Sequence, residues 1–206
     1  MKYAIQIEDV TKNYEGKCYL SAINLKIEQG KVVGIIGKSC RTVTLFMQLL
    51  SGEVMPCSGD IFYGEERLGL YGQTPEYVGV YIDQIGFLRE LTGFKNLKYI
   101  AGMNEKATSE EILEAMAFVG LNPNSRLKVS QYSKRMEQKL SIAQAIMEGQ
   151  DLLLLHADLF SKENEDNHME LRRILRKLKK LGFTIVLTSE DSKYIDKLCD
   201  ELVFLG

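Results

Sequence analysis

The sequence lacks the features of secreted, disulfide-bonded and membrane-spanning proteins. Its four cysteines, Cys18, Cys40, Cys57 and Cys199, lie far apart and form no CxxC pair, so we expect neither a zinc site nor a disulfide framework. Nowhere do about 18 apolar residues run together, and charges are spread through the first ten residues, so we expect neither a transmembrane span nor a signal peptide. The simplest interpretation is a cytoplasmic protein with reduced thiols that meets a membrane only through a partner.

The sequence also lacks an excess of charge of either sign. Its 26 Lys and Arg residues against 28 Asp and Glu residues give a formal net charge of −2, which provides no overall attraction to nucleic acid or to an anionic membrane. One run, from Met169 to Leu181, places Lys and Arg residues around a helical repeat of apolar residues. A solvated helix face is the simpler interpretation of this run and a nucleic-acid patch is the alternative, so we expect no nucleic-acid partner.

Short runs rich in Val, Ile and Leu alternate along the chain with longer helical patterns. This order predicts buried parallel strands joined by crossover helices. The predicted strands are Val32 to Ile36, Val78 to Ile82, Leu152 to Leu155 and Phe183 to Leu187. The stretch before them, Tyr3 to Ile27, alternates in the manner of antiparallel strands.

Helix signals occupy the middle of the chain. Thr108 followed by Glu111 predicts a capping box, and Gly120 ends that helix. A second helix is expected from about Ser133 to Gly149. We therefore expect an α/β fold with a mainly parallel sheet, an N-terminal antiparallel β portion and a helical subdomain over about residues 87–148. The length of 206 residues suits a single domain that spans residues 1–206.

A predicted strand, loop and helix follow one another at residues 31–52, which is the context of a phosphate-binding P-loop. The strand is KVVGII, the loop is GKSCRTVT and the helix is TLFMQLLSG, with Thr44 shared by the loop and the helix. Gly37 opens the loop and Thr44 keeps the hydroxyl that would bind Mg²⁺. Thr42 stands at the second glycine position, however, and Val43 at the lysine position. The letters GKS at residues 37–39 do not end the motif, because the four preceding residues lie in the strand and we expect no helix to begin there.

At this point the chain resembles the ATP-binding subunits of ABC transporters. Members read roughly GxxGxNGAGKTTLLxLLxG, followed by a proline and a Ser-Gly. The residues that match here are Gly34, Gly37, Leu49, Leu50, Gly52, Pro56, Ser58 and Gly59. The resemblance implies that Tyr14 stacks on adenine and that the loop Gly37, Lys38, Ser39, Cys40, Arg41, Thr42, Val43 and Thr44 would face the phosphates.

Further segments carry the resemblance across nearly the whole chain. VGVYIDQIGFLRELTGFKNLKYIAG is similar to the Q-loop of the branch that includes bacitracin- and lantibiotic-type exporters, with Asp83 at the usual glutamine position and Gln84 after it. YSKRMEQKLSIAQAIMEGQDLLLL is similar to the signature helix and the strand that follows. Ser133 matches that signature, whereas Arg135 replaces the glycine that lets the helix approach the γ-phosphate of a partner subunit.

The catalytic positions depart from the family pattern together. After Leu155, members have Asp-Glu-Pro, whereas this chain has His156, Ala157 and Asp158. Glu190 stands where the resemblance places the switch histidine. The chain therefore lacks the lysine, both carboxylates and the histidine that the reaction uses in other members.

The resemblance with these losses implies a degenerate ATP-binding subunit that hydrolyses little or no ATP. Family members bind ATP and Mg²⁺, and we expect this binding to be weak or absent here, with no metal site. The expected partner is a transmembrane permease, an intact ATP-binding subunit, or both. The alternative is an atypical but active ATPase that energises export of a peptide or antibiotic, with Lys38 or Arg41 holding the phosphates.

Two further constellations have simpler structural interpretations. His156 with Asp158 offers two ligand types for a transition metal, but a hydrogen-bonded structural histidine explains the pattern more simply. Asp83 and Glu190 would form an acid pair if they met, and otherwise they are two polar residues that line a cleft.

Overall fold

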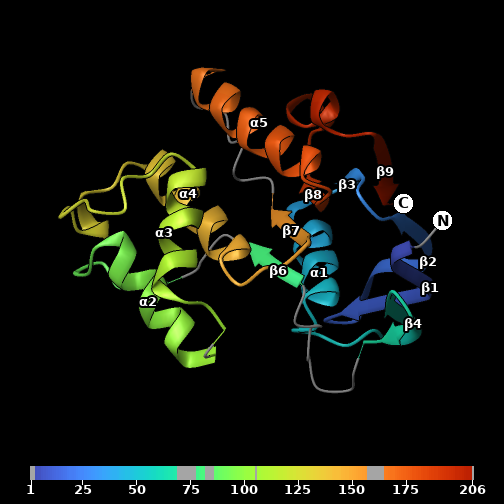
Figure 1. The fold of residues 1–206 in the computed structure, drawn as a ribbon. Coiled ribbons are helices and arrows are strands. Elements are labelled where there is room, and N and C mark those ends of the chain that lie inside the picture. Colours follow the sequence, from blue (N-terminus) through green and yellow to red (C-terminus); the bar gives the residue numbers. More distant parts are fainter. Residues whose placement is uncertain (1–2, 69–77, 82–85, 105, 157–164, 206) are drawn as a thin grey trace.

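The computed structural model contains two β-sheets and describes residues 3–68, 78–81, 86–104, 106–156 and 165–205 (Figure 1). An antiparallel sheet has the order β2-β1-β4-β5, and a second sheet has the order β6-β7-β8-β3-β9 with parallel neighbours. The strands of the first are β1 Tyr3–Tyr14, β2 Lys17–Glu28, β4 Ser58–Tyr63 and β5 Glu66–Arg67. Those of the second are β3 Val32–Gly37, β6 Val78–Tyr81, β7 Leu152–His156, β8 Thr184–Ser189 and β9 Glu201–Leu205.

The predicted α/β fold is confirmed. The runs chosen as parallel strands are β3, β6, β7 and β8, because strands covered on both faces consist of nearly continuous apolar residues. Some boundaries differ: β8 begins at Thr184 rather than Phe183 and continues to Ser189, and β3 and β7 each end one residue later than predicted. The first pair of β8 is Thr184 with Leu152, and Phe183 lies before that register. Ile82, the predicted end of β6, lies outside the described residues.

The core is divided by the parallel sheet into two apolar layers. Along β7 the side chains alternate: Leu153 and Leu155 join the layer that packs against α2–α5, while Leu152 and Leu154 join the layer shared with α1 and the antiparallel sheet. All four are 2% exposed or less. Burial on both faces explains why this strand reads as an uninterrupted leucine run.

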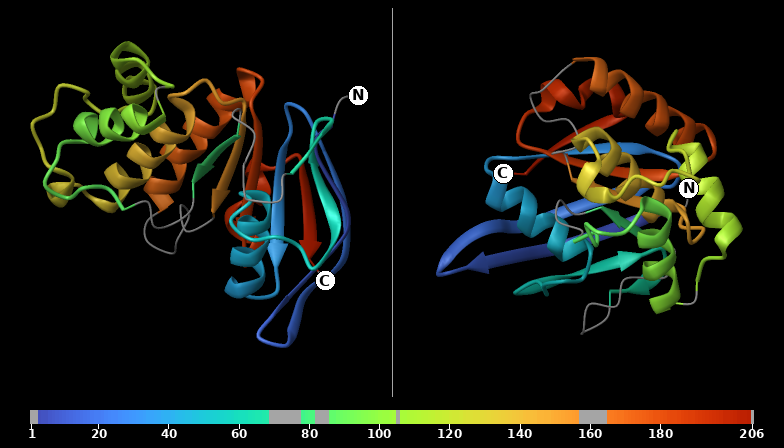
Figure 2. Two further views of the ribbon diagram at one scale, coloured as in Figure 1. Left: turned by 90° about the horizontal axis from the view of Figure 1, so that it is seen from below. Right: turned by 90° about the vertical axis from the view of Figure 1, so that its left-hand side faces the viewer.

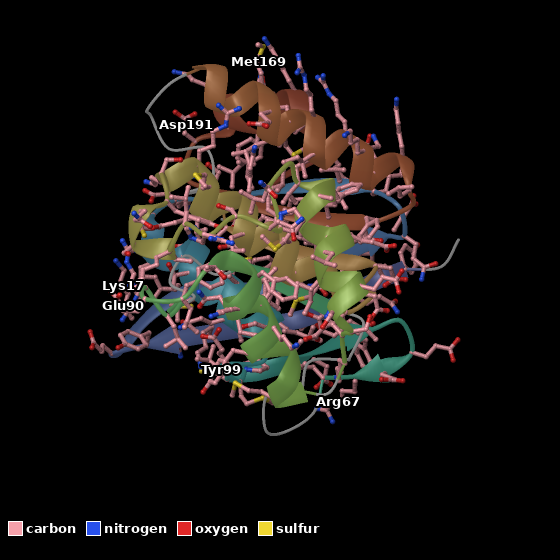
Figure 3. The ribbon with its side chains drawn as sticks, turned by 60° about the vertical axis from the view of Figure 1, so that its left-hand side comes forward. Lys17, Arg67, Glu90, Tyr99, Met169 and Asp191 are labelled. Carbon is pink, nitrogen blue, oxygen red and sulfur yellow. The ribbon has the colours of Figure 1, made fainter. Side chains whose placement is uncertain are left out.

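Helices lie on both sides of the parallel sheet. They are α1 Cys40–Leu50, α2 Gly93–Asn104, α3 Ser109–Phe118, α4 Lys134–Ile146 and α5 Glu165–Lys180, with short 3₁₀ turns at Val129–Gln131, Ser192–Tyr194 and Asp196–Leu198. Figure 2 shows α2, α3 and α4 at one end of the molecule and the antiparallel sheet at the other. In Figure 3, Tyr99 on α2 and Met169 on α5 lie at the surface, where they are 58% and 53% exposed.

The predicted helix ends were correct for α3. The Thr108 hydroxyl accepts a hydrogen bond from the Glu111 amide at 3.3 Å, and the Glu111 carboxylate accepts one from the Thr108 amide at 2.7 Å. Gly120 has a φ of +75°, a left-handed conformation that glycine adopts readily after a helix. The helix predicted from Met169 starts earlier, at Glu165. The assignment of residues 1–206 to one domain with a helical subdomain stays a prediction.

No helix in the described part of the chain is long and apolar enough to cross a bilayer. The described cysteines are free, with Cys18, Cys40 and Cys57 exposed. Cys199 packs against Gly34, where an added Cβ would lie 2.8 Å from the Cys199 sulfur. Burial, followed by the nearby Asp200 charge, raises the pKa of Cys199 to about 12. The stability that this thiol contributes is therefore present at neutral pH and lost as the pH rises toward that value.

Alkylation should separate the four thiols into two classes. At pH 8, iodoacetamide should modify the three exposed cysteines quickly and Cys199 on the order of a hundredfold more slowly, because Cys199 is half-buried and its raised pKa leaves little thiolate. Peptide mapping by mass spectrometry would give the rates. The urea-unfolded chain is the control and should lose the distinction, whereas equal rates in the folded protein would contradict the packing of Cys199.

An ion pair joins α4 to α5. Lys139 is nearly buried, and its Nζ lies 2.6 Å from Glu170 Oε1 and 3.5 Å from the carbonyl oxygen of Gly120, which it approaches as a donor. Burial lowers the pKa of Lys139, and the charge of Arg135 lowers it further. Without Glu170 this ammonium group would be left in the interior without its carboxylate, which is costly. The pair therefore connects the end of α3, the middle of α4 and the start of α5.

Replacement of Glu170 should destabilise the protein more than replacement of an exposed acid. Glu170→Gln is expected to lower the free energy of unfolding by about 1–2 kcal/mol, because it weakens a charge-assisted hydrogen bond to a nearly buried lysine. The matched control is Glu90→Gln, whose pair with Lys128 is exposed on both sides and should contribute much less, because solvent screens an exposed ion pair. Urea denaturation would measure both, and equal losses would contradict this account.

Candidate functional site

The carboxyl ends of the central strands meet at one edge of the parallel sheet. β8 lies between β3 and β7, so Gly37 at the end of β3, Glu190 just after β8 and His156 at the end of β7 are gathered at this edge. Crevices at the carboxyl ends of strands are where open α/β sheets bind ligands. The structure therefore brings several of the predicted site positions together.

The turn between β3 and α1 corrects the predicted phosphate loop. α1 begins at Cys40, directly after the GKS residues, and not at Thr44 as we expected. Ser39 caps the helix: its hydroxyl accepts a hydrogen bond from the Thr42 amide at 3.2 Å, and its carbonyl accepts one from the Val43 amide at 3.1 Å. Cys40 and Thr42 carry Cβ atoms where the family pattern has glycine, so this segment is free to become helical rather than an open loop.

Val43 closes the inside of this turn. Its side chain is 1% exposed, and an added Cβ at Gly37 would lie 2.6 Å from Val43 Cγ2. An isopropyl group thus packs against the last residue of β3, at the position where the resemblance places a lysine. The inner side of the turn offers contact to apolar groups and no positive charge.

The outer side of the turn is polar. Lys38, Cys40 and Arg41 are exposed, whereas Thr44 is half-buried. The Cζ of Arg41 lies 3.9 Å from the centroid of the Tyr14 ring, a cation–π contact. The structure therefore does place Tyr14, at the end of β1, beside this turn. Its ring is covered by a guanidinium group of the same chain.

Several predicted site residues fall outside the described part of the chain. These are Asp83 and Gln84 of the Q-loop-like segment, and Ala157 and Asp158 after β7. The predicted pairing of Asp83 with Glu190 and that of His156 with Asp158 stay untested. Among the described residues no three His, Cys, Asp or Glu side chains gather in a way that could hold a metal ion.

The signature-like segment forms the start of α4. Ser133 is the N-cap, and its hydroxyl accepts a hydrogen bond from the Met136 amide at 3.3 Å. Arg135, in the first turn, forms an ion pair with Glu170 on α5. Glu170 is therefore shared by Arg135 and Lys139. The residue that replaces the signature glycine is held by its own chain.

Two roles were not predicted from the sequence: that of Ser39, which was expected to face phosphate, as the N-cap of α1, and that of Glu170 as an ion-pair partner. Ser39 had a readable signal, since a serine three residues before Thr42 in a glycine-free segment is a typical helix N-cap. Glu170 is the one acid in the basic run from Met169 to Leu181. That signal indicated an internal partner for the cations but did not identify which residue would meet it.

Comparison with known proteins identifies the family to which the chain belongs. The profile of the ABC transporter family matches residues 20–156. The uncharacterized ABC transporter ATP-binding protein YybJ of Bacillus subtilis is 33% identical over 196 residues, which cover 95% of this chain and 89% of that protein. The bacitracin transport ATP-binding protein BcrA of Enterococcus faecalis is 31% identical and matches 97% of this chain, but this chain spans only 65% of its length.

Solved structures show the same fold at lower identity. The structure of cbiO1 from Clostridium perfringens, described as part of the ABC transporter complex cbiONQ, aligns with a TM-score of 0.86 at 19% identity over all of this chain and 86% of that one. A dimeric post-hydrolysis state of the ATP-binding cassette MJ0796, bound to ADP and Pi, aligns with a TM-score of 0.81 at 17% identity, covering 98% of this chain and 94% of that one. With its fold, its sequence match and its relatives in agreement, the chain belongs to the family of ABC transporter ATP-binding subunits.

Proposed function

We propose that this chain is a degenerate ABC ATP-binding subunit that hydrolyses little or no ATP and acts as a docking or regulatory subunit. The observation that carries the proposal is the start of α1 at Cys40. Ser39 accepts the amides of Thr42 and Val43, so neither amide is available to a phosphate group. A P-loop binds its anion with such inward-turned amides.

The groups at this site do not fit MgATP. Val43 supplies no ammonium group, and β7 ends at His156 where a carboxylate would hold the metal ion. Glu190, an exposed acid at the neighbouring strand end, would repel a phosphate rather than position it. Phosphoryl transfer depends mainly on positioning and charge neutralisation, with single contributions worth ~10³-fold in rate. We therefore assign no catalytic step to this chain.

The alternative is an atypical ATPase in which the outer side of the turn holds the phosphates. The exposed Lys38 is the observation that favours it, because that residue lies beside the turn and its ammonium group is open to solvent. A solvated loop lysine explains the same observation. The two functions differ in one measurable respect: only the alternative predicts MgATP binding that is lost in Lys38→Ala.

The proposed partners are a transmembrane permease, an intact ATP-binding subunit, or both, met from the cytoplasmic side. Support comes from the relatives: BcrA is named as a transport ATP-binding protein, and cbiO1 is described as part of a transporter complex. A subunit without turnover would contribute to such a complex through binding rather than through hydrolysis. Co-expression with a permease and with an intact subunit, followed by purification through a tag on this chain, would identify the partner.

The first prediction from this proposal concerns turnover. The purified protein should hydrolyse ATP ~10³-fold or more slowly than an intact family member assayed beside it, because the lysine and the metal-binding carboxylate are both replaced. Val43→Lys alone should not restore activity, since Ser39 would still take the amides at the start of α1. Turnover comparable to that of the intact subunit, and abolished by Thr44→Ala, would overturn the proposal.

The second prediction concerns nucleotide binding and assembly. MgATP should neither bind with micromolar affinity in calorimetry nor convert monomers into head-to-tail dimers in light scattering. Such a dimer needs bound nucleotide and a small residue at the start of the signature helix. Val43 disfavours nucleotide binding, and Arg135 is a large residue at the helix start. A nucleotide-dependent shift from monomer to dimer would contradict the proposal. A dimer that forms equally without nucleotide would point to a different interface.

A further inference from the structure

The ring of Tyr14 is held in place by a tight hairpin. β1 ends at Tyr14, which pairs with Lys17, the first residue of β2. The two residues between them, Glu15 and Gly16, have φ values of +49° and +75°, as in a two-residue turn that reverses the chain. Lys17 lies at the surface in Figure 3, and Tyr14 is 37% exposed. The hairpin thus fixes the backbone from which the aromatic ring projects.

Arg41 lies over this ring. Its Cζ is 3.9 Å from the ring centroid, a distance at which a planar guanidinium group contacts the aromatic face. Within the described part of the chain no carboxylate pairs with Arg41. The Tyr14 ring is therefore the principal partner of this side chain.

The position of Arg41 in α1 makes this contact informative. Arg41 is the second residue after the N-cap Ser39, and the first turn of the helix contains no acid. The positive end of the helix dipole favours acids at such positions and disfavours cations. Local helix preference therefore does not explain an arginine here, whereas contact with Tyr14 does.

We propose that Arg41 is a specificity-determining residue that covers the Tyr14 ring and excludes an adenine base from it. This inference deepens the proposed function and rests on it, because the adenine role of Tyr14 comes from the family resemblance. An incoming base must displace the guanidinium group before it can stack. The turn thus excludes both parts of a nucleotide: its own helix takes the amides that would bind phosphate, and Arg41 occupies the platform for the base.

The fluorescence of a single tryptophan at position 14 can show whether Arg41 covers the ring, without any nucleotide. The chain contains no tryptophan, so Tyr14→Trp introduces a unique fluorophore whose ring also accepts a cation. Arg41→Ala in this background should raise acrylamide quenching of the tryptophan about two- to fivefold, the ratio that corresponds to a cover worth ~0.5–1 kcal/mol. Lys38→Ala, the matched exposed cation of the same turn, should leave quenching unchanged. Equal quenching with and without Arg41 would overturn the inference.

Adenosine, which has the base but no phosphate, then tests the exclusion. Arg41→Ala should strengthen adenosine binding about two- to fivefold, and adding Tyr14→Ala should remove that gain. If Arg41→Ala instead weakened ATP binding, Arg41 would be a phosphate ligand and the inference would be wrong. Radical footprinting of Tyr14 in the native sequence gives the same readout should the tryptophan variant fold poorly, with greater modification expected in Arg41→Ala.

These tests keep the two proposals apart. ATP turnover by the native protein would overturn the proposed function, whereas the quenching experiment uses no nucleotide and judges only the cover by Arg41. If the Tyr14 ring is covered but the protein hydrolyses ATP, the contact with Arg41 stands and the claim that Arg41 excludes adenine is wrong. If the Tyr14 ring is uncovered and the protein is inactive, the contact with Arg41 is wrong and the proposed function stands.

Discussion

The junction between β3 and α1 is the constraint on which the rest of the site depends. β3 lies between β8 and β9 in a buried parallel sheet; Ile36 pairs with Ser189 of β8, and Gly37 pairs with Leu205 of β9, so the end of β3 is held in place by both neighbours. Only Lys38 and Ser39 separate it from the helix. Once Ser39 caps α1, the first amides of the helix bond within the chain. The shape of the turn then follows from helix formation rather than from a bound anion.

The two arginines that stand at small residues of the family pattern both have a partner within the chain. Arg41 contacts Tyr14, and Arg135 pairs with Glu170. A site that had lost one catalytic residue would leave its remaining groups oriented toward a ligand. Here cations near the expected nucleotide positions are directed to partners on β1 and α5. This internal pairing gives both cations a partner that does not depend on a ligand.

The sequence predicted the strands and the α3 cap because the causes of these features are local. Leu152 to Leu155 reads as a strand since both faces of β7 are buried, and Thr108 with Glu111 specifies a cap within one turn. The contact between Lys139 and Glu170 spans 31 positions in the chain, so no local pattern encodes it. The start of α1 was missed for another reason. Strand, loop and helix compete there, and the resemblance to a P-loop outweighed the capping signal of Ser39.

Glycines of the family pattern are present at two positions of this chain near the P-loop-like turn and absent at two others. Gly34 is retained where an added Cβ would lie 2.6 Å from Leu202, and Gly37 where it would lie 2.6 Å from Val43. Close packing therefore favours glycine at both positions. The positions of Cys40 and Thr42, which are glycine in the family pattern, carry side chains in the first turn of α1. Gly34 and Gly37, the glycines that match the family pattern, are therefore ones that also pack tightly against the core.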